Sequence, residues 1–288
     1  MRIEALVLCL VFGLQLVGQE VYKRDQLISP PRFQVGDAWR DVTQFKLTQV
    51  IRTPKGDLDF SQGDRQIFTN EVTGVDANGA ITGVWRFYKE ANVIMPRGTV
   101  LPRGHSGRHV QLERRGDETI VTGYRVTNGN KVKVALSPKS MDELQAERFR
   151  FDQEHYESLL EILPEDVALG FTVEYPRELL ARLTGLGDEL RADKSKFSLV
   201  FSELTEDTIT FTINGTLSFE SRDGNNVIRG QTYIKGSKMT YRRSPFMFLT
   251  LKMGSLTDLD MTNGRQKIEG AGRFQLTRDR VISQPKQP

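Results

Sequence analysis

The feature that most constrains the fold is a period-two alternation of apolar and polar side chains from residue 207 to residue 279. Between Thr208 and Glu220 the large apolar residues all fall on odd numbers, and polar residues occupy the even positions. Successive side chains of a β-strand point to opposite faces, so this parity predicts a strand with one buried face. Glycine and asparagine interrupt the alternation and divide the whole stretch into about five antiparallel strands.

The dipeptide Asn214-Gly215 lies inside this alternation and is a candidate hairpin turn. A two-residue turn there pairs Ile213 with Thr216, which mixes the apolar and polar faces. We therefore predict one long strand over residues 208–220, which bends at Gly215 because that residue has no side chain to resist bending. The chain then turns at residues 222–226.

A second Asn-Gly dipeptide, Asn263-Gly264, predicts a tight hairpin. A two-residue turn there places Leu259 opposite Ile268 on one face and Asp260 opposite Lys267 on the other. Both pairs are favourable, so this register is the prediction.

A third such sequence, Asn128-Gly129-Asn130, predicts a three-residue loop. Only that choice places Val126 opposite Val132 and Tyr124 opposite Val134. The first half of the chain therefore also reads as a series of hairpins, with strands predicted over 39–52, 65–75, 81–89, 110–114, 118–126 and 131–136.

The N-terminus differs in composition from the rest of the chain. An apolar run from Ala5 to Val17 follows Arg2, as in a signal peptide, which we place at residues 1–19. The alternative is an uncleaved single-span anchor. The only cysteine, Cys9, lies in this run, so the remaining chain has none for disulfides or thiol chemistry, and a bacterial periplasmic or secreted protein is expected. We expect no stable transmembrane span once the segment is removed.

The charge balance indicates no particular partner. The chain has 40 basic and 37 acidic residues, a formal net charge of +3. Nucleic-acid-binding proteins usually concentrate basic residues on one face, so no nucleic-acid partner is predicted.

The middle of the chain changes to helical spacing. Ser140 and Glu143 form a capping-box pattern, and apolar residues follow at intervals of three and four up to Pro164. A shorter helix is predicted from Pro176 to about Thr184.

The predicted fold class is therefore mainly β (α+β), with a strongly bent antiparallel sheet or half-open barrel and a helical insert at about residues 140–190. We divide the chain into a signal peptide (1–19), an extended lead-in (20–32), a β-rich domain (33–282) and a disordered tail (283–288). The domain is open to division into two β halves, 33–137 and 166–282, around the helix 140–163.

Short motifs carry a resemblance to known proteins. The sequence Val35-Gly36-Asp37-Ala38-Trp39, the turn Val75-Asp76-Ala77-Asn78-Gly79 and the C-terminal strands resemble a broad group of exported bacterial β-rich proteins of unassigned function. The predicted layout also resembles the lipoprotein-carrier fold of the bacterial periplasm. That resemblance implies a half-open barrel that holds acyl chains, although it supplies no catalytic residue.

One C-terminal stretch, Phe246–Leu249, is apolar on both faces of a strand. It fits a central strand covered on both sides. The alternative is that one face lines an apolar ligand cavity, whose candidate lining residues are Met239, Met247, Leu249, Leu251 and Met253.

Residues 97–115 are rich in arginine. They form a candidate loop for an anionic surface such as lipid headgroups, carried by Arg97, Arg103, Arg108, Arg114 and Arg115. The alternative is a solvated loop balanced by acids elsewhere.

The same region holds two histidines four residues apart, His105 and His109. On a helix this spacing places two metal ligands on one face, but Pro102, Gly104 and Gly107 argue against a helix, and no metal or other cofactor is predicted. No nucleophile motif is present. The sequence predicts an exported, non-catalytic protein that binds an apolar ligand or serves as an envelope scaffold, with lipid or another envelope component as partner. The alternative is a secreted hydrolase with a dispersed site near His105 and His109.

Overall fold

A computed structural model describes residues 20–53, 55–95, 98–116, 118–145, 151–175, 190–223, 226–263 and 266–283. The predicted signal peptide, the helix predicted from Pro176 and nearly all of the predicted tail lie outside these ranges.

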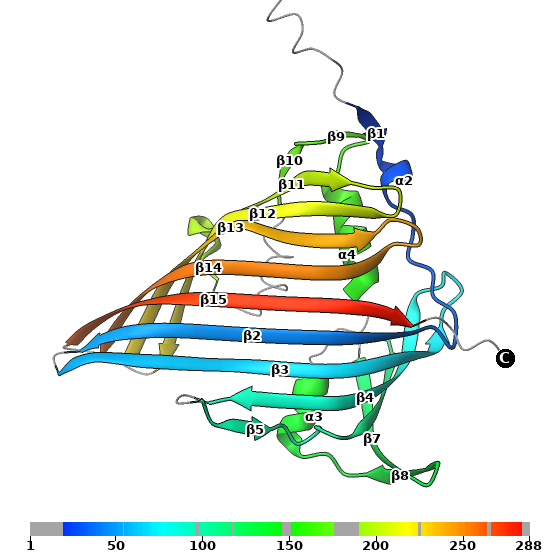
Figure 1. Ribbon diagram of the computed structural model, residues 1–288, viewed down its shortest axis with the longest axis horizontal. Coiled ribbons are helices and arrows are strands. Elements are labelled where there is room, and N and C mark those ends of the chain that lie inside the picture. The colour runs from blue at the N-terminus through cyan, green and yellow to red at the C-terminus, as the bar shows by residue number, and fades with distance from the viewer. Residues whose placement is uncertain are drawn as a thin grey trace, which may run out of the picture.

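The described chain is mostly β-strand with a few short helices (Figure 1). The strands are β1 (Val21–Lys23), β2 (Ala38–Thr53), β3 (Gly56–Val75), β4 (Ile81–Ile94), β5 (Val100–Pro102), β6 (His109–Arg115), β7 (Glu118–Thr127), β8 (Asn130–Val134), β9 (Asp166–Ala168), β10 (Thr172–Glu174), β11 (Lys196–Leu204), β12 (Thr208–Asp223), β13 (Asn226–Arg242), β14 (Met247–Asn263) and β15 (Gln266–Ser283). The helices are α2 (Arg24–Leu27), α3 (Pro138–Gln145), α4 (Phe151–Ile162) and the short 3-10 helix η4 (Ala192–Lys194). Of the helices that the structure describes, none combines the length and the apolar character needed to cross a membrane.

One antiparallel sheet of 13 strands dominates the structure. Its order is β10-β11-β12-β13-β14-β15-β2-β3-β4-β6-β7-β8, with β5 paired to β4. The last strand, β15, pairs with β2 along almost its whole length, from Glu269↔Arg52 to Ser283↔Ala38. Among the strands that the structure describes, the two ends of the path, β10 and β8, do not pair with each other. The predicted fold class, mainly β with a strongly bent antiparallel sheet, is confirmed.

The two faces of this sheet differ. We call the face against which α3 and α4 pack the helix side and the opposite face the outer side; in Figure 1, α4 lies by β12–β14 and α3 by β4 and β5, toward the two ends of the sheet. Side chains alternate between the two sides along each strand. On β14, for example, Leu251 and Leu259 are buried on the helix side, whereas Lys252 and Asp258 are exposed on the outer side.

Two apolar cores form on the helix side. In the first core, Leu159 of α4 and Leu163, which directly follows this helix, pack with β11–β14 side chains such as Phe211 and Met239. In the second, Leu144 of α3 packs with β3, β4, β6 and β7. The helical insert therefore supplies apolar cover to both ends of one sheet.

The long strand predicted over residues 208–220 is confirmed, as β12 runs unbroken through Asn214. The pairing with β13 shifts between Ile213 and Gly215, which is a β-bulge at the predicted bend. A Cβ atom at Gly215 would lie 2.3 Å from the carbonyl oxygen of Lys196. Glycine is thus required by the close approach of β11 as well as by the bend.

The predicted register of the last hairpin is wrong. Asn263 pairs with Gln266, so Leu259 lies opposite Gly270, Met261 lies opposite Ile268, and Asp260 lies opposite Glu269 rather than Lys267. The observed and predicted registers place the same residues on the same face, because they differ by two in the sum of the paired numbers. Apolar parity alone does not distinguish them.

The three-residue loop at 128–130 is also wrong. Thr127 pairs with Asn130, and Asn128 and Gly129 form a two-residue turn with φ values of 50° and 78°. Positive φ at both positions is the backbone that Asn-Gly favours in hairpins. Most of β8 is exposed, so burial does not compete with this turn preference.

The helix predicted to begin at Ser140 begins earlier. Pro138 is the first residue of α3, and the Ser137 hydroxyl accepts a hydrogen bond from the Ser140 amide at 3.2 Å. Ser137 is therefore the cap, and proline occupies the first helical position, where its missing N–H is not needed. Glu143 does not complete a capping box but forms an ion pair with Arg103 at 2.6 Å.

Residues 20–33 pack onto the end of the sheet. β1 pairs with β9, and Leu27 and Ile28 are buried in the first core. Arg243 donates to carbonyl oxygens of this segment, those of Gln26 at 2.6 Å and Leu27 at 3.1 Å. Its side chain ties the N-terminal segment to the β13–β14 turn.

Candidate functional site

A band of partly exposed apolar side chains crosses the helix side of the central strands. We call the residues Phe45, Leu47, Met253, Phe274 and Leu276 the aromatic band. Met253 pairs with Leu276, Leu276 with Phe45, and Phe274 with Leu47, so the five lie side by side on β14, β15 and β2. The rings of Phe45 and Phe274 are 5.4 Å apart. Met253 and Leu276 pack against the first core, whereas the other three belong to neither core.

A buried charged cluster lies at one end of this band. Arg280 donates to Asp41 at 2.9 Å and to Asp152 of α4 at 2.7 Å, and Arg278 donates to Asp41 at 3.1 Å. The guanidinium of Arg280 also lies over the Trp39 ring, 4.8 Å from its centre. The cluster joins three elements, because Asp41 of β2 and Asp152 of α4 both accept hydrogen bonds from Arg280 of β15.

Electrostatics keep this cluster ionised. Burial alone would raise the pKa of the Asp41 carboxyl, but Arg280 and Arg278 outweigh burial and hold that pKa well below its usual range. Burial opposes the charge of Arg280, yet Asp152 and Asp41 raise its pKa above the ordinary value. A buried ion pair of this kind holds elements in register, and it offers no free group for chemistry.

The predicted cavity-lining residues lie in different environments. Met239 and Leu251 are buried in the first core, and Met247 is buried in the second. Leu249 sits at a register shift between β13 and β14 and is partly exposed. Of these five residues, Met253 belongs to the aromatic band. The alternation of side chains along the central strands indicates this band, whereas a run that is apolar on both faces does not.

The two histidines near the predicted alternative site are packed as aromatic rings. His105 is 1% exposed and lies edge-on to Tyr88, with ring centres 4.5 Å apart. His109 stacks on Trp85 and Phe87. Burial lowers the pKa of His105 to about 4, so the ring is neutral near pH 7. Its Nδ1 is 3.9 Å from Glu143, whose carboxylate is already paired with Arg103.

Among the residues that the structure describes, no three histidine, cysteine, aspartate or glutamate side chains are grouped as metal ligands.

The predicted arginine loop is dispersed, and Arg97 lies outside the described residues. Arg103 is bound by Asp64 and Glu143, which attaches the loop to β3 and α3. Arg115 pairs with Glu113 at 3.5 Å, and Arg114 donates to the Gly116 carbonyl oxygen at 2.6 Å. Arg108 is partly exposed and binds β4 through its backbone carbonyl, which accepts from Tyr88 at 3.0 Å.

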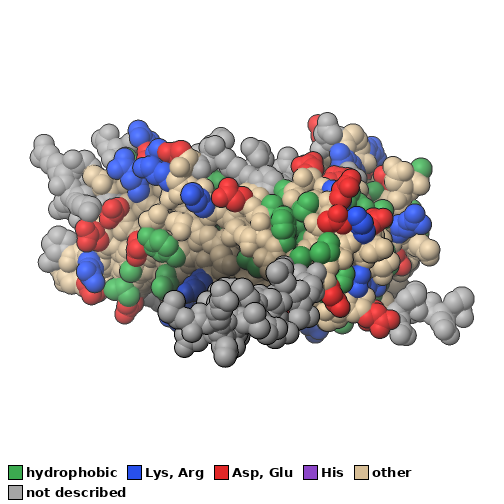
Figure 2. Space-filling view, turned by 90° about the horizontal axis from the view of Figure 1, so that it is seen from above, with side chains coloured by type: hydrophobic (Ala, Val, Ile, Leu, Met, Phe, Trp, Pro, Cys, Tyr) green, Lys and Arg blue, Asp and Glu red, His purple; other side chains and the backbone are tan. Residues whose placement is uncertain are grey.

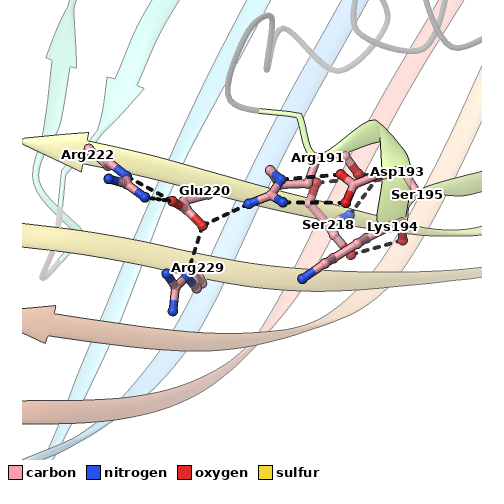
Figure 3. A network of polar contacts seen from close by, with 8 residues as sticks. All are labelled: Arg191, Asp193, Lys194, Ser195, Ser218, Glu220, Arg222 and Arg229. Atoms are coloured by element: carbon pink, nitrogen blue, oxygen red, sulfur yellow. Dashed lines mark hydrogen bonds and ion pairs between the residues drawn. The ribbon is translucent and has the colours of Figure 1, made fainter.

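A polar network on the outer side surrounds Glu220 (Figure 3). This carboxylate accepts hydrogen bonds from Arg222 at 2.6 Å, Arg229 at 2.9 Å and Arg191 at 3.1 Å, and Arg191 also pairs with Asp193. Hydrogen bonds from Arg222 and then Arg229 lower the pKa of Glu220 to about 2. The network joins the residues before η4 to β12 and β13.

This network borders a pocket of about 680 Å³. Its lining residues are Arg191, Lys194, Ser218, Phe219, Glu220, Arg229, Gly230, Gln231, Asp258 and Asp260. The three basic residues are matched by three acidic ones, so the pocket has no excess charge with which to select an ionic ligand. The face shown in Figure 2 has the same character, with basic and acidic side chains interspersed over the coloured surface.

Comparisons with known proteins give no family for this chain. No family model and no curated protein matches it. The chain resembles an outer membrane lipoprotein-sorting protein domain from Vibrio parahaemolyticus weakly, with 9% identity over 89% of each chain and a TM-score of 0.18. It also aligns with OccK9 of Pseudomonas aeruginosa, with 10% identity over 86% of this chain and 71% of the other and a TM-score of 0.17. TM-scores this low assign neither a shared fold nor a function.

Proposed function

We propose that the protein is an exported, non-catalytic binding protein that holds an apolar ligand of the acyl-lipid type against the helix side of its sheet. The observation that carries this proposal is the aromatic band, which lies between two well-buried cores yet keeps its own side chains partly exposed. Apolar surface of this kind is a common feature of ligand-binding grooves. Aliphatic and aromatic neighbours suit a flexible hydrocarbon chain, and Met253 adds an adaptable wall.

The proposed compartment is the bacterial envelope or its exterior. The apolar run after Arg2 supports export, and the only cysteine of the chain lies within that run. A lipid or another envelope component is the corresponding proposed partner.

The packing of the histidines favours binding over hydrolysis. A general base must reach the proton that it removes, and the His105 ring is 1% exposed against Tyr88. Its depressed pKa follows from this burial. The ring therefore has the surroundings of a packed aromatic side chain.

The test is native mass spectrometry and lipid extraction of protein purified from its own host without detergent. We expect a stoichiometric acyl lipid on the natural protein. Phe45→Ala and Phe274→Ala should each reduce recovered lipid at least about tenfold, because burying a phenylalanine contributes about 1.5–3 kcal/mol. Leu256→Ala is the matched control, since Leu256 lies on the outer side of β14 and is 58% exposed.

A ligand-free natural protein would count against a carrier and would leave the scaffold function. Equal loss of lipid in Leu256→Ala and Phe274→Ala would show that the lipid is bound without use of the aromatic band.

A further inference from the structure

A second pocket, of about 380 Å³, lies on the outer side of the central strands. Its polar lining residues come from four strands and are Gln44, Lys46, Lys235, Ser237, Lys252, Gln275 and Thr277. We call it the lysine pocket. Met253 also borders this pocket, but its side chain and those of the rest of the aromatic band point to the opposite face of the same strands. The two sites therefore use different side chains, and this inference does not rest on the proposed function.

The strand register builds the pocket. Lys252 pairs with Thr277 and Thr277 with Gln44, while Gly254 pairs with Gln275 and Gln275 with Lys46. These two adjacent rows across β14, β15 and β2 present lysine, glutamine and threonine side chains on the outer side. A Cβ atom at Gly254 would meet no atom within 4 Å, so the missing side chain leaves open space beside both rows.

A bulge in β13 forms the remaining wall. The pairing of β13 with β14 shifts between Ile234 and Lys238, and Gly236 has a φ of 65°. The Gly236 amide donates to the side-chain oxygen of Asn214 at 2.9 Å, which fixes the bulge to β12. The bulge brings Lys235 to the pocket, and bulges of this kind often re-aim a side chain beside a functional site.

The charges in this pocket are uncompensated. Among the described residues, no acidic side chain lines it and none of Lys46, Lys235 and Lys252 forms an ion pair. Lys252 also lies directly opposite Lys238, whose ammonium is paired with Glu203. Like charges directly opposite each other destabilise a sheet. The ion pair with Glu203 offsets part of this repulsion at Lys238, and a bound anion would offset the charge of Lys252.

We propose that the lysine pocket binds a compact polyanion that carries phosphate or sulfate groups. Three ammonium groups supply the charge, and Gln44, Gln275 and Thr277 supply neutral hydrogen-bond donors to the same oxygens. The contrast with the pocket around Glu220 is direct, since there every basic lining residue is balanced by an acidic one. The volume of about 380 Å³ is within the range of small-ligand sites.

Isothermal titration calorimetry with inorganic tripolyphosphate at low ionic strength tests this proposal. The pocket variant is Lys46→Gln/Lys252→Gln, and the control, Lys133→Gln/Lys139→Gln, removes the same charge from exposed positions on β8 and α3. We expect the pocket variant to bind at least tenfold more weakly than the natural protein and the control to bind within twofold of it. Binding should also weaken with added salt.

A second variant keeps every charge. Gly254→Val fills the open space with a β-branched residue, which suits a strand, so the protein should fold and lose tripolyphosphate affinity at least tenfold. Absence of tripolyphosphate binding by the natural protein would overturn the proposal. So would equal weakening in the pocket and control variants, which would show attraction to net charge alone.

Flotation with vesicles then identifies the source of the anion. Binding to phosphatidylglycerol vesicles, but not to phosphatidylcholine vesicles, that is lost in the pocket variant supports a lipid headgroup. Tripolyphosphate binding without vesicle binding supports a soluble phosphate or sulfate ester. Vesicle binding that survives in both pocket variants would overturn the lysine pocket as the site of contact with lipid.

Discussion

Arg280 donates a hydrogen bond of 2.7 Å to Asp152, and both side chains are 2% exposed. This contact joins β15, the last strand, to α4 in the helical insert. Asp152 also accepts a hydrogen bond from the backbone amide of Phe248 at 2.6 Å. One carboxylate therefore fixes the position of the helix relative to two strands.

Arg280→Met is expected to lower the free energy of unfolding by about 3–5 kcal/mol, since it leaves two buried carboxylates without their main cation. Urea denaturation measures this loss. Arg229→Met is the control, because that arginine is exposed and shares Glu220 with two others. Similar losses in both variants would contradict a special role for the buried cluster.

Acid should weaken the same cluster. The pKa of Asp41 in the folded protein is below its unfolded value, so its contribution to stability is complete above that unfolded value, near pH 4. It is lost as the pH falls toward the folded pKa. Urea midpoints of the natural protein should drop below pH 4, and Asp41→Asn should show a smaller drop over this range.

His105 predicts a different pH window. Its pKa falls from an ordinary 6.5 to about 4 on folding, so protons bind the unfolded chain more readily and stability should decline from pH 6.5 to pH 4. His105→Phe keeps a ring beside Tyr88 and should remove part of that decline while leaving stability at pH 8 nearly unchanged. A variant with the same slope as the natural protein would show that the decline comes from other groups.

Gly215 and Gly254 form a matched pair for testing close strand approach. Gly215→Ala places a Cβ atom 2.3 Å from a backbone oxygen and should cost about 1–3 kcal/mol. Gly254→Ala meets open space and should be neutral or stabilising, because alanine restricts the unfolded chain. Thermal unfolding of both variants measures the difference, and an equal shift would contradict the steric explanation.

Arg243→Lys tests the attachment of residues 20–33. A lysine keeps the charge but cannot reach the carbonyl oxygens of Gln26, Leu27 and Thr205 together, as Arg243 does. Amide hydrogen exchange in residues 20–31 should accelerate about tenfold or more, consistent with losing roughly 1.5 kcal/mol of hydrogen bonding. Exchange in β3 should not change, and a uniform acceleration would indicate global destabilisation instead.

Parity of side chains predicted much of this architecture from the sequence. It identified β12 as one strand, and the same parity places Arg278 and Arg280 on the face of Phe274 and Leu276. The partners of these arginines were not predictable, because Asp41 and Asp152 are distant in sequence. The predicted strand register was wrong where the alternation of side chains does not distinguish the alternatives. These places are β8, which is largely exposed, and the last hairpin, where two registers bury the same residues.

The lysine pocket was missed for a related reason. Lys46, Lys235 and Lys252 are ordinary surface lysines in the sequence, and only the order of strands brings them together. The bulge at Gly236 also shifts β13 relative to β14 and leaves no sequence signal beyond a single glycine.

The pairing of β15 with β2 has a consequence for how the chain is made. During synthesis, β2 emerges well before its partner β15, which is more than 200 residues further along the chain. The pairing at the centre of the sheet therefore forms last. Until β15 docks, the nascent polypeptide presents unpaired edges on both halves, and such edges invite association between chains. The addition of β15 thus joins the two halves of the sheet and pairs their exposed edges. A chain truncated before residue 266 should therefore be prone to aggregation.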